Sequence, residues 1–459
     1  MHRNLIKYLH EWKNRPDHKP LMIRGARQVG KTWLVREFSK SFESFLEINF
    51  DEQQDKHSLF KSGEVTDIIR LLQVDWGKSI IPGKTLLFLD EIQAAPEVIR
   101  LLRYFYEKVP GLHVIAAGSL LEFVLKDEVE SMPVGRIEFM FIGPLTFEEF
   151  LLAQGENYLV DYLAAWIPGQ EIPETLHKKC LAQLRSFMAV GGMPEPVARF
   201  CEAGDFAAAA RIQAGILETL QADFSKYGMK IDSRLLRLVF RRAPQIVGAK
   251  VKYVNITPDE SAGRLHQALQ ALADARLITI VYHSDGGLPL NACCNMRRFK
   301  ILYLDIGLFT QALSPGAGNG ILLAENLLTA NCGAAAEQLV GQHLLYPAES
   351  WSTPGLHYWH SEQVSASAEV DYLLQFELAV VPVEVKAGKT GSLRSLQVFC
   401  FKKRCGLALR FNTDYPSLGE VRHTIPALGE VSYRLLSLPI YMVGQSRRLL
   451  GASLLSHLD

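Results

Sequence analysis

Short apolar runs alternate with amphipathic stretches through residues 1–150 of the chain. The apolar runs have the length of single strands and occupy residues 21–23, 45–50, 85–90 and 113–119. The stretches between them, such as residues 97–109, carry apolar residues at helical spacing. Apolar strands that alternate with helices are typical of a parallel sheet covered on both faces, so the sequence predicts an α/β fold here.

After residue 150 the pattern becomes mostly helical as far as residue 227, with breaks at residues 166–174 and 191–197. Pro194 and Pro196 lie in the second break. They predict a rigid turn there, because proline is excluded from the interior of a helix.

A second helical pattern covers residues 258–275, with Thr257 as its expected N-cap. It leads into a strand-like run that ends in a turn at residues 276–287. Together with a preceding helix, these elements predict a unit of the winged-helix type. Residues 300–309 are then expected to form one more strand, and residues 334–345 a helix.

The composition of the chain bears on its partners, its thiols and its location in the cell. The 459 residues include 49 Lys and Arg against 49 Asp and Glu, so any contact with nucleic acid must come from a local patch. The seven cysteines show no zinc-binding spacing and are expected to be reduced thiols. The N-terminus lacks the apolar core of a signal peptide, and we find no run of about 18 uncharged apolar residues. We therefore expect a cytoplasmic protein without a membrane span.

The loop at residues 25–32 reads GARQVGKT and matches the pattern G-x-x-x-x-G-K-T. Glycines let backbone N–H groups curl around a phosphate, and the N-terminus of the next helix adds a favourable dipole. Lys31 can reach the β- and γ-phosphates of ATP, and the Thr32 hydroxyl can ligate Mg²⁺. A chance match in a turn is the alternative, but the position between a strand and a helix favours nucleotide binding. The residues expected to contact the nucleotide in this segment are Gly25, Gln28, Val29, Gly30, Lys31, Thr32 and Trp33.

Two acidic residues follow the third apolar run in the segment TLLFLDEIQ. Asp90 is expected at the carboxyl end of the strand, where it can hold the metal ion through water or Thr32. Glu91 is the candidate base that orients the attacking water. Ser119 closes the next strand and can hydrogen-bond the γ-phosphate or its water. Ordinary loop acids and a helix-capping serine are the alternatives.

The segments GARQVGKT, LDEIQ, AAGSLLEF and SMPVGRIEFMFIGPLTFEEF resemble the AAA+ ATPases of a prokaryotic, STAND-like subgroup. In that subgroup the ATPase is followed by a conserved region of unknown function. The resemblance implies that Arg136 lies near a phosphate of its own or a neighbouring subunit, with a surface position as the alternative. It also implies that Pro194, in a G-x-P turn of a helical lid, lies against the adenine, with a helix connector as the alternative. Thr146 and Glu149 are expected to form a capping box without a chemical role.

A second group of charged residues lies near the end of the chain, in two expected strands joined by a turn. Asp371 is on the first strand, and Glu384 and Lys386 point to the same face of the second. The two carboxylates and the carbonyl of Val385 are oxygen ligands that suit Mg²⁺ or Mn²⁺, and Lys386 can position or deprotonate a water. Glu337, on the preceding helix, is a candidate further metal ligand.

The order Glu, Asp, Glu-x-Lys resembles the PD-(D/E)XK nuclease superfamily, although no proline precedes Asp371. The resemblance implies phosphodiester cleavage, with Asp371, Glu384 and Lys386 as catalytic residues and Glu337, Asp371 and Glu384 at the metal. Many members of the superfamily bind without cutting. Charges on an exposed face of a sheet are the alternative.

A basic segment at residues 226–252 contains eight Lys or Arg and one acid. Arg234, Arg237 and Arg241 share one face of a helix in this segment. We expect this face to contact DNA phosphates, with a solvated surface as the alternative.

The sequence thus predicts an α/β multidomain protein with a P-loop AAA+ core, a helical lid, a winged-helix-like unit and a nuclease-like α/β domain. The expected boundaries are residues 1–150, 151–230, 231–325 and 326–459. The expected function is ATP hydrolysis with Mg²⁺ that controls a nuclease-like site, with Mg²⁺ or Mn²⁺, acting on DNA, and the protein is a candidate homo-oligomer. The alternative is a regulatory ATP switch whose inactive C-terminal domain binds nucleic acid or a partner protein.

Overall fold

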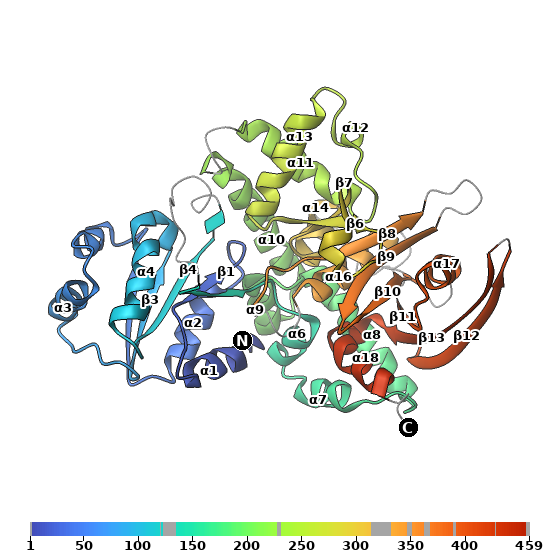
Figure 1. Ribbon diagram of the computed structural model, residues 1–459, viewed down its shortest axis with the longest axis horizontal. Helices are drawn as coiled ribbons and strands as arrows, with labels where there is room; N and C mark the ends of the chain where they lie inside the picture. Colours follow the sequence, from blue (N-terminus) through green and yellow to red (C-terminus); the bar gives the residue numbers. More distant parts are fainter. Residues whose placement is uncertain are drawn as a thin grey trace.

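The computed structural model describes residues 2–119, 121–122, 135–226, 231–313, 332–346, 351–361, 368–388, 392–426 and 428–455. Within these residues the strands form two sheets, one of five strands and one of eight. Figure 1 shows the first sheet on the left and most strands of the second on the right. At the top are the helices α11 (Ser233–Ile246) and α13 (Ala262–Asp274).

The five-stranded sheet is parallel throughout and has the order β2-β3-β4-β1-β5. Its strands are β1 (Leu21–Arg24), β2 (Ser44–Asn49), β3 (Thr85–Asp90), β4 (His113–Gly118) and β5 (Glu138–Phe141). Every residue of β3 and β4 is buried, as expected for central strands that are covered on both faces. The predicted parallel α/β sheet is therefore confirmed.

Helices cover both faces of this sheet. They are α1 (Leu5–Asn14), α2 (Lys31–Ser39), α3 (Val65–Trp76) and α4 (Pro96–Lys108). Side chains of β1 alternate between two cores, because successive residues of a strand point to opposite faces. Met22 packs in the core that contains α3 and α4, whereas Leu21 and Ile23 pack in the core that contains α1 and α2. The second of these cores continues from Leu5 to Leu450, so the N-terminal domain shares it with the rest of the chain.

A helical section follows the first sheet. Its helices are α6 (Phe147–Ala153), α7 (Asn157–Ala165), α8 (Glu174–Val190), α9 (Pro194–Ala203) and α10 (Phe206–Ala222). The predicted capping box is confirmed, because Thr146 Oγ1 accepts from the Glu149 N–H at 3.2 Å and Glu149 Oε2 from the Thr146 N–H at 2.9 Å. The break before α9 is also confirmed, but Pro194 and Pro196 lie in the first turn of that helix. The first turn tolerates proline because its N–H groups have no acceptor within the helix.

Helices α11 and α13 are joined by a segment that contains the short helix α12 (Tyr253–Ile256). The N-cap of α13 is Ser261, which accepts a hydrogen bond from the Arg264 N–H, so the prediction of Thr257 as the cap is wrong. Thr257 is extended, and its hydroxyl instead accepts a bond from the Asp259 N–H in a local turn.

The eight-stranded sheet has the order β12-β13-β11-β10-β9-β8-β6-β7. Its strands are β6 (Ile278–Ser284), β7 (Cys294–Tyr303), β8 (His357–Ser361), β9 (Ala368–Phe376), β10 (Ala379–Val385), β11 (Leu407–Asn412), β12 (Ser417–Ile425) and β13 (Gly429–Pro439). The strand expected as part of a winged-helix unit is β6, and it belongs to this sheet, because its Tyr282 pairs in parallel with His357 of β8. The winged-helix prediction is therefore not confirmed.

Strand β7 ends at Tyr303, and the helix α14 (Ile306–Leu313) follows it. The prediction of one strand over residues 300–309 is therefore wrong beyond Tyr303. The physical reason is Asp305, whose carboxylate accepts bonds from the N–H groups of Gly307 and Leu308 and so begins a helix.

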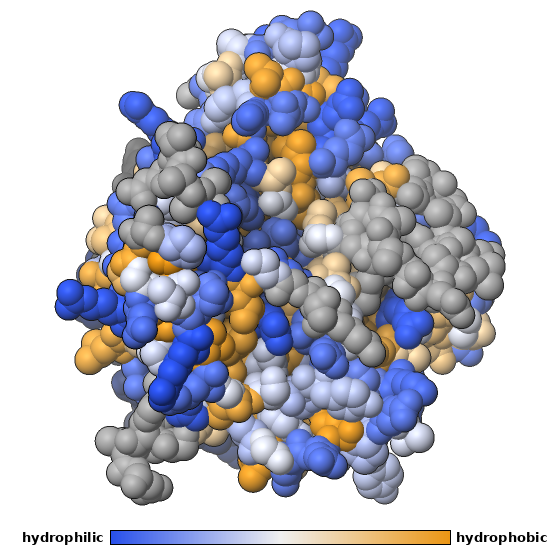
Figure 2. Space-filling view, turned by 90° about the vertical axis from the view of Figure 1, so that its right-hand side faces the viewer, coloured by the Kyte–Doolittle hydropathy of each residue, from blue (hydrophilic) through white to orange (hydrophobic). Residues whose placement is uncertain are grey.

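The remaining helices α16 (Cys332–Leu345), α17 (Arg394–Lys403) and α18 (Ser446–Leu455) pack on the eight-stranded sheet. Figure 2 views the molecule from the right-hand side of Figure 1 and shows hydrophilic residues interspersed with hydrophobic patches, an ordinary pattern for a protein surface. In the part of the chain that the structure describes, no helix combines the length and the apolar character needed to span a membrane.

Candidate functional site

The segment at residues 25–32 follows β1 and runs into α2, which begins at Lys31, as the sequence predicts. Gly30 is the N-cap of α2 and has a φ of 91°, a conformation that residues with side chains rarely adopt. A Cβ on Gly25 would lie 2.3 Å from the carbonyl oxygen of Ile142, so this position requires glycine. The loop therefore leads directly to the N-terminus of α2, where an anion is bound favourably.

The side chain of Lys31 is buried and folds back over this loop. Its Nζ donates hydrogen bonds to the carbonyl oxygens of Gly25 at 3.0 Å and Ala26 at 2.7 Å. Burial lowers the pKa of Lys31 to about 8, although the nearby carboxylates of Glu91 and Asp90 act in the opposite direction. A phosphate would give this ammonium a stronger partner than two neutral carbonyls, because hydrogen bonds between ionised groups are stronger.

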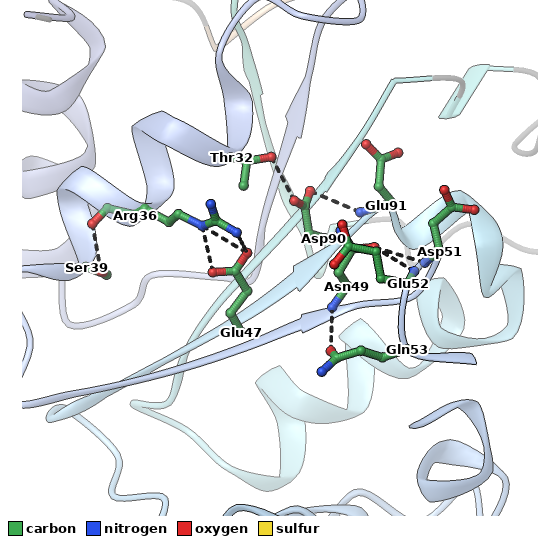
Figure 3. A network of polar contacts seen from close by, with 10 residues as sticks. All are labelled: Thr32, Arg36, Ser39, Glu47, Asn49, Asp51, Glu52, Gln53, Asp90 and Glu91. Atoms are coloured by element: carbon green, nitrogen blue, oxygen red, sulfur yellow. Dashed lines mark hydrogen bonds and ion pairs between the residues drawn. The ribbon is translucent and has the colours of Figure 1, made fainter. Parts of the chain in front are cut away.

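Asp90 lies at the carboxyl end of β3 and contacts the start of α2. The Thr32 hydroxyl donates a hydrogen bond to Asp90 Oδ2 at 2.7 Å, and Figure 3 shows the two side chains facing each other. Burial raises the pKa of Asp90, and the bond from Thr32 lowers it in part. A hydroxyl next to a carboxylate is an oxygen pair that can hold Mg²⁺, so these residues fit the metal that the sequence predicts.

Glu91 and Gln93 follow Asp90 in a tight turn. Glu91 has a φ of 50°, which is uncommon for a residue other than glycine. Gln93 donates a hydrogen bond to Glu91 Oε2, while its own Oε1 is buried without a partner among the described residues. Ser119 Oγ is likewise buried without a hydrogen-bond partner among the described residues. Both side chains border one cavity, where a water or a phosphate oxygen can complete their hydrogen bonds.

This cavity has a volume of about 800 Å³ and lies between the loop, the end of β3 and the helical section. Gln93 was not anticipated from the sequence, although it stands in the LDEIQ segment. The predicted nucleotide residues that line the cavity are Gln28, Gly30, Lys31, Thr32, Trp33, Glu91, Ser119 and Pro194. Pro194 borders the loop directly, because a Cβ on Gly30 would lie 3.4 Å from Pro194 Cγ. Gly25, Val29 and Asp90 are not part of this lining.

Arg136 is not brought to the cavity of its own chain. Its Nε donates a hydrogen bond to Oε1 of Glu107, near the end of α4, at 2.9 Å. Arg136 precedes β5, whose start pairs with the start of β1, so the residue lies at the amino end of the parallel sheet. The loop lies at the opposite, carboxyl end. A role for Arg136 at the nucleotide of a neighbouring subunit stays a prediction.

Two arginines near the loop were missed in the sequence. Arg3 is 4 % exposed and donates hydrogen bonds to the carbonyl oxygens of Val29 at 3.0 Å and Gly143 at 2.8 Å. Arg27 forms an ion pair with Asp223, and both side chains line the cavity. No local pattern signals these contacts, because the partners lie 26 to 196 residues apart in the chain.

Asp305 is a further buried residue without a sequence signal. Its carboxylate accepts hydrogen bonds from the N–H groups of Gly192 at 2.7 Å, Gly307 at 2.9 Å and Leu308 at 3.1 Å. It also accepts one from the side chain of Gln342 at 3.2 Å. Burial raises the pKa of Asp305, and these bonds act against that shift. Because Gly192 precedes α9 and Gln342 belongs to α16, Asp305 joins the helical section to the C-terminal part.

The C-terminal strands bring the predicted acidic residues together. Strands β9 and β10 are antiparallel, and Val383 pairs with Tyr372. The next position in this register sets Glu384 opposite Asp371. Asp371 Oδ2 accepts a hydrogen bond from the Val385 N–H at 2.8 Å, and Lys386 forms an ion pair with Glu384. Glu337 faces this group from α16, as predicted.

Lys300 and Glu369 complete what we call the acidic cluster: Glu337, Glu369, Asp371 and Glu384 with Lys300 and Lys386. The Nζ of Lys300, on β7, lies 3.5 Å from Glu337 Oε2 and 3.9 Å from Asp371 Oδ1, and it forms an ion pair with Glu369. Glu369 was missed, although it stands two residues before Asp371 on the same strand. Lys300 comes from a strand far away in the chain and gives no local signal.

Burial dominates the electrostatics of this cluster. It raises the pKa of Glu337 to about 8 and that of Glu384 to about 7, and the carboxylate of Asp371 adds to both shifts. Burial would lower the pKa of Lys300, but the carboxylates around it, with Glu337 first, raise that pKa above its ordinary value.

The fit of a metal ion to this cluster is partial. Among the described residues, no three His, Cys, Asp or Glu side chains stand ready as a metal site. Glu384 Oε2 is nevertheless buried without a hydrogen-bond partner. An unpaired buried carboxylate oxygen is the feature here that fits a cation, since such an oxygen otherwise costs free energy.

The predicted DNA contact of the basic segment is not confirmed. Arg237 and Arg241 donate hydrogen bonds to oxygens of Gln221 at 3.4 and 2.7 Å. The side chain of Lys226 and all of Lys230 lie outside the described residues. The two arginines therefore hold α11 against the end of α10.

Family models match three parts of the sequence. Residues 17–151 match an AAA domain, and residues 181–317 and 332–427 match two domains of unknown function, DUF8612 and DUF4143. Each match covers less than half of the chain. The first match and the geometry of the loop support an ATP-binding P-loop ATPase of the AAA+ type.

Three solved structures have a distant likeness to this chain. The ORC2 protein of Aeropyrum pernix in ADPNP-ADP complexes is 12% identical, with a TM-score of 0.37 over 69% of this chain and 92% of that one. The ORC1 protein of the same organism in complex with DNA is 13% identical, with a TM-score of 0.29 over 70% and 93%. PCH-2 of C. elegans is 11% identical, with a TM-score of 0.28 over 44% and 62%. TM-scores this low carry no argument about function. No curated protein sequence matches the chain.

Proposed function

We propose that this protein hydrolyses ATP and that its nucleotide state controls a metal-dependent, nuclease-like site in the C-terminal part that acts on DNA. The observation that carries the first half is the cavity at which Lys31, Glu91 and Ser119 meet Pro194. Lys31 and Ser119, which suit phosphate binding, and Glu91, which suits water activation, thus line the same cavity as Pro194 of α9, a helix of the helical section. Closure of that section over a nucleotide can change how it sits against the rest of the chain.

In the proposed reaction the N-terminus of α2 and the Lys31 ammonium hold the phosphates of ATP. Thr32 and Asp90 hold Mg²⁺, which neutralises charge on the phosphate oxygens when it is bound. Glu91 orients the attacking water and accepts its proton. Ser119 donates a hydrogen bond to the γ-phosphate or to that water, which gives its buried hydroxyl the partner it lacks.

Replacing Lys31 with alanine is expected to weaken ATP binding by about 30-fold or more, because a charge-assisted hydrogen bond contributes about 2 kcal/mol. A titration of the full chain with a fluorescent ATP analogue measures this affinity. Lys40→Ala is the matched control, since Lys40 is an exposed lysine at the end of the same helix, paired with Glu37. Unchanged affinity in folded Lys31→Ala protein would discredit the nucleotide site.

The acidic cluster supports the second half of the proposal. Asp371 and Glu384 lie on neighbouring strands, Glu337 faces them from α16, and Glu384 keeps an unpaired oxygen. A bound Mg²⁺ or Mn²⁺ would supply charge stabilisation for a phosphodiester under attack. Lys386, which forms an ion pair with Glu384, would position the attacking water or, in its neutral form, deprotonate it.

Asp371→Asn is expected to lower DNA cleavage by about 100-fold or more while ATP turnover stays within about twofold of wild type, because only the first activity uses this carboxylate. Cleavage is measured on single-stranded, duplex and branched DNA, and on RNA, with ATP and Mg²⁺ or Mn²⁺. Glu377→Gln, in the exposed turn between β9 and β10, is the matched control. Cleavage by Asp371→Asn at the wild-type rate would locate the activity elsewhere or in a contaminant.

A regulatory ATP switch with a C-terminal part that binds without cutting is the second candidate. The observation that favours it is Lys300, whose ammonium lies among Glu337, Glu369 and Asp371. If wild-type protein with ATP and either metal leaves every substrate intact, this candidate replaces the first.

A further inference from the structure

Lys300 is a buried cation at the centre of the acidic cluster. Its side chain is 3 % exposed, and within the described part of the chain the three carboxylates within 4 Å of its ammonium belong to Glu337, Glu369 and Asp371. These residues come from α16 and β9, whereas Lys300 comes from β7. The fold, and not proximity in the sequence, therefore builds this contact.

The ammonium of Lys300 is compensated by several carboxylates at once. Lysine has three N–H donors and no acceptor, and three carboxylates surround Lys300. The other ammonium of the cluster, on Lys386, is paired with Glu384. A lysine buried to this degree is tolerated only where opposite charge compensates for its lost hydration. The four carboxyl groups of the cluster thus surround two resident cations.

Two of the three carboxylates around Lys300 are residues that the proposed function assigns to a metal ion. The ammonium of Lys300 neutralises part of the negative charge on Glu337 and Asp371 that would otherwise attract Mg²⁺ or Mn²⁺. Two cations at one group of oxygens also repel each other. The unpaired Oε2 of Glu384 remains available to a metal ion, whereas the nearest oxygens of Glu337 and Asp371 lie within 4 Å of the Lys300 ammonium.

We propose that Lys300 is an internal cation that competes with the divalent metal ion for the acidic cluster, so that metal binds only where the lysine side chain gives up Glu337 and Asp371. This inference rests on the proposed metal-dependent function and adds a regulation to it. The resting site is held in a metal-poor form by a residue of the chain itself. A change that moves β7 relative to α16 and β9 raises the affinity for metal.

Mn²⁺ binding to the full, nucleotide-free chain tests this proposal, measured through the electron paramagnetic resonance signal of free Mn²⁺. Lys300→Gln is expected to bind Mn²⁺ at least about 30-fold more tightly than wild type, because it removes a competing charge and leaves the carboxylates. Lys300→Arg retains the charge and is expected to stay near the wild-type affinity. Lys403→Gln, an exposed lysine on α17, is the matched control for loss of one positive charge.

Adding Asp371→Asn to Lys300→Gln is expected to abolish the gain in Mn²⁺ affinity. Such a loss would assign the tighter Mn²⁺ binding to the acidic cluster and not to the nucleotide loop. If Lys300→Gln does not fold, as judged by circular dichroism, the double variant Lys300→Gln/Glu369→Gln removes one opposite charge with the ammonium. It is expected to show the same tighter binding.

Two results would overturn the inference, and they have different meanings. The first result is that wild type and Lys300→Gln bind Mn²⁺ with equal affinity and that Asp371→Asn abolishes the binding in both. It would show a metal site at which the lysine does not compete. Absence of Asp371-dependent binding in every variant would remove the metal site itself, and with it the nuclease half of the proposed function.

Discussion

Replacing Glu91 with glutamine is expected to lower the rate of ATP hydrolysis by about 100-fold to 10,000-fold, the range that a positioned general base contributes. Glu91 lines the cavity that contains Lys31 and Ser119, and it is held there by the bond from Gln93. Its left-handed backbone, with a φ of 50°, is the kind of local strain found where a side chain must be aimed at a reaction. Glutamine retains the size and polarity of the side chain but cannot accept the proton of the attacking water.

The same variant is expected to bind ATP within about threefold of the wild-type affinity, because Lys31, Thr32 and Asp90 supply the proposed phosphate and metal contacts. Phosphate release gives the turnover rate, and a fluorescent nucleotide titration gives the affinity. Glu97→Gln, an exposed residue in the first turn of α4, is the matched control. A normal turnover rate in Glu91→Gln would assign water activation to another group.

Asp305→Ala is expected to lower the free energy of unfolding by about 3 kcal/mol or more, the largest effect on stability that we predict. The substitution leaves the buried N–H groups of Gly192, Gly307 and Leu308 and the Gln342 amide without their acceptor. Each unsatisfied buried donor carries a desolvation cost of about 1–3 kcal/mol, which local relaxation and water reduce in part.

Urea denaturation followed by circular dichroism measures this loss. Asp305→Asn keeps one oxygen acceptor and is expected to lose less stability than the alanine variant. Asp259→Ala, at an exposed aspartate before α13, is expected to change the free energy of unfolding by less than about 0.5 kcal/mol. Equal stability of Asp305→Ala and wild type would mean that the buried bonds of Asp305 contribute nothing net.

Local patterns in the sequence determined much of the first sheet. The apolar runs that form β3 and β4 are buried on both faces. The glycines at residues 25 and 30 mark a tight loop, which the pattern G-x-x-x-x-G-K-T already predicts. The capping box at Thr146 is likewise a pattern of neighbouring residues. Such features are predictable because the interacting groups are within a few positions of each other.

Contacts between distant parts of the chain were not predictable. Lys300 reads as an ordinary strand residue, and its partners Glu337 and Asp371 lie on other elements. Strand β6 and the turn after it have the pattern of a separate wing, and only the pairing of β6 with β8 reveals that it belongs to the second sheet. Arg3 is missed for the same reason, since nothing around it in the sequence points to Val29. A single sequence carries no record of such pairs.

The contact of Asp305 with the turn before α9 has a mechanical consequence. A Cβ on Gly191 would lie 2.7 Å from the Cα of Gly307, so the two backbones touch with no side chain between them. Closely packed backbone can be neither compressed nor repacked by a change of rotamer. A shift of the turn next to Pro194 would therefore displace Gly307 in the first turn of α14, four residues after Tyr303, where the strand that carries Lys300 ends.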